Sequence, residues 1–126
     1  MVDAPTLLQG LRTLIRGAFD EEPLEVFFEP QASLTFPYIT LSLQNYDTHL
    51  QRAIFKIRIG LFGHANQRLN ITRYGQTIGQ QLIRPTRLTL PSGEMSVSLA
   101  RGEEKYNHLS QNVHAITQTY DGFLNT

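Results

Sequence analysis

The side chains in this sequence that could do chemistry are four histidines and two pairs of adjacent acids. They are His49, His64, His108 and His114, with Glu21 beside Glu22 and Glu103 beside Glu104. No two histidines have the short spacing that places zinc ligands together on one helical face. Adjacent acids could act in acid–base catalysis, but charged pairs in polar segments are usually solvated. Neither group predicts a catalytic or metal site.

Motifs for nucleophilic catalysis and for phosphate-bearing cofactors do not occur in the sequence. It has no Gly-x-Ser-x-Gly elbow, no Ser-x-x-Lys motif and no glycine-rich phosphate loop. The absence of Cys excludes a cysteine nucleophile, a zinc ribbon and a disulfide framework. We therefore expect a protein that is not an enzyme and that uses no cofactor.

The charges are segregated along the chain, although the formal net charge is +0. Residues 48–93 contain only basic charges, namely Arg52, Lys56, Arg58, Arg68, Arg73, Arg84 and Arg87. Residues 20–29 contain only acids, namely Asp20, Glu21, Glu22, Glu25 and Glu29. Two interpretations stay open: the segments neutralise each other within one subunit, or they meet across a subunit boundary. A further form of this second, functional interpretation is that the basic segment faces phosphate groups.

Length and composition predict one soluble domain over residues 1–126. A hydrophobic content of 40% is enough for a core, and no apolar run is long enough to span a membrane. The neutral balance lacks the electrostatic footprint of a dedicated nucleic-acid-binding protein. A cytoplasmic location is the default expectation.

Two segments have helical spacing of apolar residues. In residues 6–19, leucine and isoleucine recur every three or four positions after Pro5, which suits a helix start. In residues 65–83, Ile71, Ile78 and Leu82 share a face, with two glycines four residues apart beside them. These glycines, Gly75 and Gly79, indicate that the helix lies close to a sheet.

Six segments are expected to be strands. They are residues 24–29, 39–43, 52–61, 86–90, 94–101 and 112–120. The polar stretch Asn45 to His49 is expected to link a long hairpin as a projecting tip, and residues 101–112 to form a loop or an extended arm. The order of elements predicts an α+β fold, with a largely antiparallel sheet and two helices packed on one face.

The order of these features resembles the tail-completion or tail-terminator proteins of long-tailed phages, prophages and phage-like gene transfer agents. It comprises an apolar N-terminal helix, an acidic stretch and Phe-Pro-Tyr-Ile-Thr-Leu at residues 36–41. A polar turn with Asp47 and Thr48, the strand AIFKIRIGLFG, a helix from Ala65 and the late strand VHAITQTY follow.

This resemblance implies a virion protein of the tail or neck, assembled in the host cytoplasm. Such proteins form a ring, usually a hexamer, that stops tail-tube polymerisation and docks the head-side connector, or stopper. The implied partners are further copies of the chain, the tail tube protein, the connector and DNA passing non-specifically through the channel. No membrane partner is implied.

Two alternatives remain beside this interpretation. A head–tail connector or neck protein of the same particles would also form a ring but would bind the connector. A small-molecule-binding α+β domain would instead need a buried polar pocket.

A ring needs two different patches that meet between neighbours, and segregated charges suit that requirement. We therefore expect the subunit and partner interface to lie in the acidic stretch, the hairpin and the 101–112 segment. Its predicted residues are Asp20, Glu21, Glu22, Glu25, Asp47, His49, Arg52, Lys56, Arg58, Arg101, Glu103, Glu104 and Lys105. Contact of the basic row with a neighbour is favoured over a basic channel, which would retain DNA that must slide.

Overall fold

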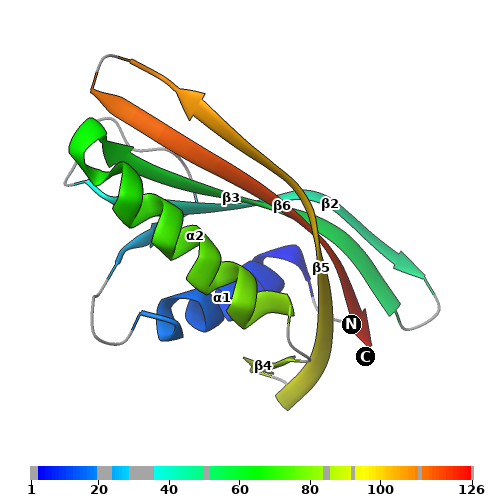
Figure 1. The fold of residues 1–126 in the computed structure, drawn as a ribbon. Helices are drawn as coiled ribbons and strands as arrows, with labels where there is room; N and C mark the ends of the chain where they lie inside the picture. Colours follow the sequence, from blue (N-terminus) through cyan, green and yellow to red (C-terminus); the bar gives the residue numbers. More distant parts are fainter. Residues whose placement is uncertain are drawn as a thin grey trace.

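The fold is a curled six-stranded sheet that wraps around two helices (Figure 1). The computed structural model describes residues 3–19, 24–28, 36–49, 52–83, 86–91, 93–110 and 112–125. The elements are α1 (Ala4–Gly17), β1 (Val26–Phe27), β2 (Tyr38–His49), β3 (Arg52–His64), a 3-10 turn (Ala65–Gln67), α2 (Arg68–Ile83), β4 (Thr86–Leu90), β5 (Gly93–His108) and β6 (Val113–Asn125). The predicted α+β class is confirmed.

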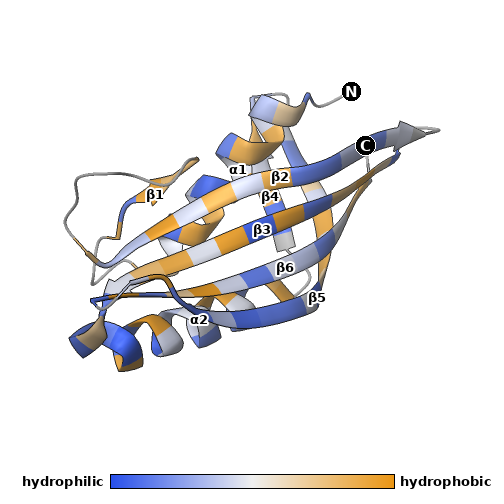
Figure 2. Cartoon of the chain, turned by 90° about the horizontal axis from the view of Figure 1, so that it is seen from above, coloured by the Kyte–Doolittle hydropathy of each residue, from blue (hydrophilic) through white to orange (hydrophobic). Residues whose placement is uncertain are grey.

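The sheet has the strand order β1-β2-β3-β6-β5-β4. Every neighbouring pair is antiparallel except β1 with β2. Seen from above, β2, β3, β6 and β5 lie side by side over the helices (Figure 2). We call the surface of the sheet away from the helices the outer face.

The expected link at Asn45 to His49 is wrong, because these residues belong to β2. They pair with β3 as far as His49 opposite Arg52. A bulge between Leu43 and Asn45 shifts the register and therefore interrupts the two-residue alternation that marks a strand in sequence. Whether the end of this hairpin projects from the domain stays a prediction.

The expectation of a loop or arm at residues 101–112 is also wrong for most of that segment. β5 continues to His108 and pairs with β6 from Val97 onward except at a bulge between Arg101 and Glu104, although its side chains from residue 100 onward are exposed. A strand needs backbone partners, and β6 supplies them whatever the polarity of the side chains. β6 itself extends to Asn125, beyond the expected end at residue 120.

The helix α1 lies where its apolar stripe predicts, with Leu7, Leu11 and Ile15 buried. Asp3 caps it by accepting a 2.8 Å hydrogen bond from the Thr6 amide through its carboxylate. The helix starts at Ala4, two residues earlier than expected, because this cap precedes Pro5.

The helix α2 lies close to the sheet at its two glycines, as expected. A Cβ on Gly75 would lie 2.9 Å from the Gln118 amide nitrogen and 3.3 Å from Leu61. One on Gly79 would lie 3.5 Å from the Tyr120 hydroxyl. Gly75 therefore permits a contact that alanine would obstruct.

A further close contact generates a stability prediction. Gly122 on β6 lies opposite Phe55 on β3, and any Cβ at Gly122 would clash with the Phe55 ring. Since Phe55 is 2% exposed, the ring has little room to move. We expect Gly122→Ala to destabilise the fold by about 1–3 kcal/mol, measured by urea unfolding.

The matched control is Gly17→Ala, because nothing lies within 4 Å of a Cβ built there. That change should be neutral or slightly stabilising. Combining Gly122→Ala with Phe55→Leu should recover part of the loss. Equal stability of Gly122→Ala and the parent would contradict the packing described.

Candidate functional site

The basic row of β3 lies on the outer face, as the alternation predicts. Arg52 and Arg58 are exposed and Lys56 is half-buried in a row that also contains the exposed Ile54, while Ala53, Phe55 and Ile57 between them face the core. The Lys56 ammonium lies 3.8 Å from the Asp121 carboxylate on β6. The Arg52 guanidinium lies 5.3 Å from the centre of the Phe123 ring. Ion pairs this exposed contribute little stability, so the row is available for other contacts.

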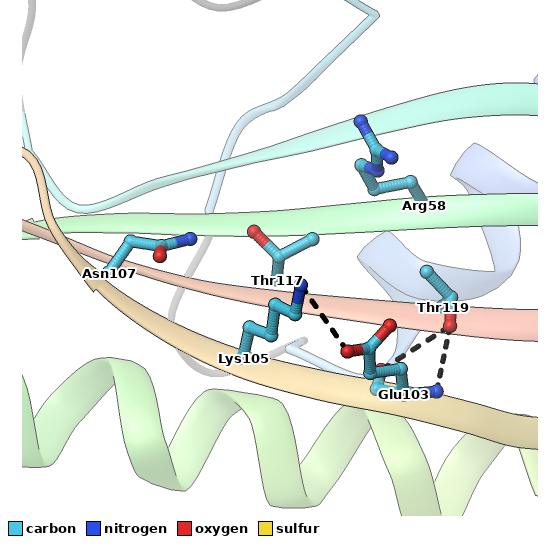
Figure 3. Close-up of a pocket in the computed structure, with 6 residues that line it drawn as sticks. All are labelled: Arg58, Glu103, Lys105, Asn107, Thr117 and Thr119. Atoms are coloured by element: carbon cyan, nitrogen blue, oxygen red, sulfur yellow. Dashed lines mark hydrogen bonds and ion pairs between the residues drawn. The ribbon is translucent and has the colours of Figure 1, made fainter.

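Arg58 borders a shallow hollow on the outer face (Figure 3). The hollow measures about 220 Å³, and its lining residues are Arg58, Glu103, Lys105, Asn107, Thr117 and Thr119. Within it, the Lys105 ammonium lies 3.4 Å from the Glu103 carboxylate. These side chains come from three adjacent strands and carry both charges, which suits contact with a polar partner surface better than enclosure of a small molecule.

A bulge in β5 determines which charges reach this hollow. The register shifts between Arg101 and Glu104, where the Thr119 hydroxyl accepts a 2.8 Å hydrogen bond from the Glu103 amide. Consequently Arg101 and Glu104 pair with each other on the helix side of the sheet. Glu103 and Lys105 lie on the outer face. The structure therefore splits these four predicted interface residues between two surfaces.

Glu104 joins a buried polar cluster under α2. The Gln118 side-chain amide, which is fully buried, donates 3.1 Å hydrogen bonds to the Gly75 carbonyl and to the Glu104 carboxylate. Its carbonyl oxygen accepts a 2.8 Å bond from the Tyr120 hydroxyl. Burial raises the pKa of Tyr120, and the nearby Arg101 opposes that shift. The cluster ties α2, β5 and β6 together.

The acidic stretch is only partly described. Asp20, Glu21 and Glu22 lie outside the described residues. Glu25 lies just before β1, where its carboxylate is 4.0 Å from Arg12 and 3.9 Å from Arg16 of α1. This acid is therefore compensated by α1, and the basic Lys56 by Asp121, rather than each by the other segment.

Three predicted residues lie together at the end of the β2–β3 pair. Asp47 is exposed and lies opposite Ile54, while His49 lies opposite Arg52 in the register. Asp47 and Arg52 thus belong to one end of the outer face, well along the sheet from Glu25. The fold places these residues in distinct regions of the subunit, and their role in a subunit or partner interface stays a prediction.

Sequence reasoning missed the contribution of β6 to the outer face. Thr117, Thr119 and Asp121 form its polar row, and their alternation with Gln118 and Tyr120 was visible in the sequence. Sequence reasoning also missed an aromatic cluster where β2 begins and β3 ends. There the Tyr38 ring stacks on Phe62 at 4.8 Å, and Phe36 lies 4.5 Å from His64. The Phe-Pro-Tyr segment thus covers the outer face where β2 begins.

The described part of the chain has neither a metal-binding cluster nor a membrane-spanning helix. No group of three or more His, Asp or Glu side chains there could hold a metal ion. His108 and His114 stack at 4.5 Å across β5 and β6. Among the described residues, no helix combines the length and hydropathy needed to cross a membrane.

Comparison with solved structures shows that this fold has precedents. A chain described as "Virion of native gene transfer agent (GTA) particle" is 15% identical and superposes with a TM-score of 0.64, covering 97% of this chain and 93% of its own. A second structure, 5% identical, has a TM-score of 0.62 and covers 97% and 92%. At these identities the likeness concerns the fold alone. No known family model matches the sequence, and no curated protein is significantly similar to it.

The bulge gives a prediction about Thr119. Thr119→Val removes both its hydrogen bond from the Glu103 amide and the 3.4 Å bond that its hydroxyl donates to the Glu103 carbonyl. We expect a loss of about 0.5–1.5 kcal/mol in unfolding free energy. Thr117→Val, in the same strand and hollow, is the control and should be close to neutral. Equal effects of the two changes would show that the bulge does not depend on Thr119.

The buried Tyr120 predicts an alkaline limit to stability. Because its pKa is higher in the folded chain, its contribution is present below the unfolded pKa of about 10 and is lost as pH rises through the folded pKa. Melting temperatures between pH 8 and 11 should fall less steeply in Tyr120→Phe than in the parent. Tyr106→Phe, at a residue 42% exposed, should follow the parent curve. A parent-like fall in Tyr120→Phe would contradict this assignment.

Proposed function

We propose that this chain is a structural protein of a phage or phage-like particle that forms a ring, with six copies, on the end of the tail tube. The ring stops tube polymerisation and provides the docking surface for the head-side connector. DNA passes through its channel without sequence-specific contacts. The work is binding and assembly, with no covalent step, and the protein resides in the tail or neck of the particle.

The observation that carries this proposal is the fold likeness to a chain of the gene transfer agent particle over 97% of this chain. The sequence resemblance to tail-terminator proteins supports it independently, because it rests on the order of motifs. The outer face adds a third support: polar and charged side chains from three strands line a shallow hollow, a composition that suits the polar rim of a subunit contact.

The charged residues have a proposed role in assembling the ring. The acidic segment with Asp20, Glu21 and Glu22 contacts the basic row of a neighbouring copy, which includes Arg58. Opposite charges on two different patches steer neighbours together and fix one orientation. Glu25, held by α1, then acts mainly within its own subunit.

Light scattering across protein and salt concentrations tests the ring, with negative-stain images of any large species. We expect a six-copy ring that loosens at high salt, since exposed ion pairs are screened. Tail tube and connector proteins are then added separately. Binding to tube ends supports the terminator role, and binding only to the connector supports the neck-protein alternative. A strict monomer with either partner contradicts the proposal.

Charge reversal tests the proposed contact. Arg58→Glu should raise the concentration needed for half-assembly by about tenfold, equivalent to about 1.4 kcal/mol. Combining it with Glu21→Lys and Glu22→Lys should restore assembly. Arg87→Glu, which changes a basic residue of β4 paired with Glu94, is the control and should assemble like the parent. Failure of the combined variant to recover would assign the acidic segment another role.

A further inference from the structure

The long strands β2 and β5 each have part of one edge with no partner strand in the described chain. β4 pairs with β5 only as far as Val97, which leaves the edge of residues 98–108 open. β1 pairs only with Ile39 and Thr40 of β2, which leaves residues 41–49 open. A strand edge without a neighbouring strand presents backbone amides and carbonyls to which another strand can hydrogen-bond.

The directions of the strands make these two edges complementary. β2, β3, β6 and β5 are adjacent, and each is antiparallel to the next. Because four strands alternate, β2 and β5 run in opposite directions. If the sheet of one copy continues into the next with the same face outward, β5 of the first meets β2 of the second antiparallel, as in every long pair within the chain.

The short strands limit where this pairing can occur. β4 occupies the edge of β5 at Gly93–Val97, and β1 occupies the edge of β2 at its beginning. In the antiparallel arrangement these two short strands lie beyond opposite ends of the shared stretch. They therefore restrict the register to one narrow range, which an unrestricted strand edge would not do.

The side of β5 nearest α2 offers room for the added strand. A hollow of about 790 Å³ lies there, lined by Gln76, Gly79, Gln80, Ile83 and Arg101. Ile83 is 51% exposed and offers an apolar contact at this hollow. Side chains of a strand paired to β5 alternate between the outer face and this hollow, so half of them would cover α2.

We infer that neighbouring copies join by pairing the open edge of β5 in one copy with the open edge of β2 in the next. This inference rests on the proposed ring and specifies how its subunits meet. The strand added to each open edge belongs to a second copy of the chain. One chain carries both edges, their strands run in opposite directions, and β1 and β4 limit the register.

Hydrogen–deuterium exchange with peptide resolution tests the pairing in the full-length chain. Exchange is compared between monomer at low concentration and the assembled species. We expect amides in residues 41–49 and in residues 98–108 to slow together by at least about tenfold. Peptides from α1 serve as the internal control and should not change.

Proline variants test whether the contact is head-to-tail. Neighbouring residues in a strand direct their amides to opposite sides, so only one of each pair tolerates proline. Asp47→Pro and Thr48→Pro are compared for the β2 edge, and Lys105→Pro and Tyr106→Pro for the β5 edge. The variant of each pair that keeps the parent melting temperature is used. Each should be monomeric alone, and an equimolar mixture should form dimers through the one intact interface.

The outcomes separate this inference from the proposed ring. Rings without slower exchange at the two edges overturn the edge pairing and leave the ring intact. Edge-protected dimers or open chains that never close support the pairing and overturn the ring. Edge variants that still assemble alone overturn the pairing, and a monomer under every condition, tube protein included, overturns both. If no proline variant keeps its fold, the exchange result on the parent chain decides.

Discussion

The side-chain amide of Gln118 is the contact on which much of the architecture depends. It is fully buried, and a buried amide without partners would cost about 1–3 kcal/mol for each unmade bond. Its partners impose requirements on three elements. The Gly75 carbonyl must come close to the Gln118 amide, so α2 needs a residue without a side chain at that position. The Tyr120 hydroxyl must point toward the core, and Glu104 must lie on the helix side of the sheet. The last requirement places the neighbouring Lys105 on the outer face.

The fold class, both helices and the central strands could be predicted from sequence because their apolar spacing is regular. The alternation of β3 was sufficient to assign its basic row to the outer face, and the glycines of α2 to predict close packing. The two largest errors concern strands that contain a bulge, at Leu43 to Asn45 and at Arg101 to Glu104. In β2 the bulge interrupts the alternation, and in β5 the exposed polar side chains beyond the bulge made a paired strand look like a loop or arm.

The candidate site was harder to predict, since spatial grouping of charges depends on topology. Glu25 and Arg58 belong to segments of opposite charge, yet Glu25 pairs with α1 while Arg58 borders a hollow built by β5 and β6. The sequence places β6 last, and nothing in the local pattern says that it lies between β3 and β5. That insertion of β6 brings Thr119 and Asp121 beside the basic row.

The bulge in β5 has a consequence for how this chain can vary. The alternation of side chains between the two faces is the same before and after the bulge, because Arg101 and Glu104 both point toward α2. The extra residue therefore changes the strand only locally. A chain lacking Gly102 would continue β5 as a regular strand without exchanging its faces, and would lose the local twist that a bulge adds. The curvature of this edge is therefore more sensitive to an insertion or deletion of one residue than to most substitutions. Among chains of this fold, segment length here should vary together with the bend of the sheet.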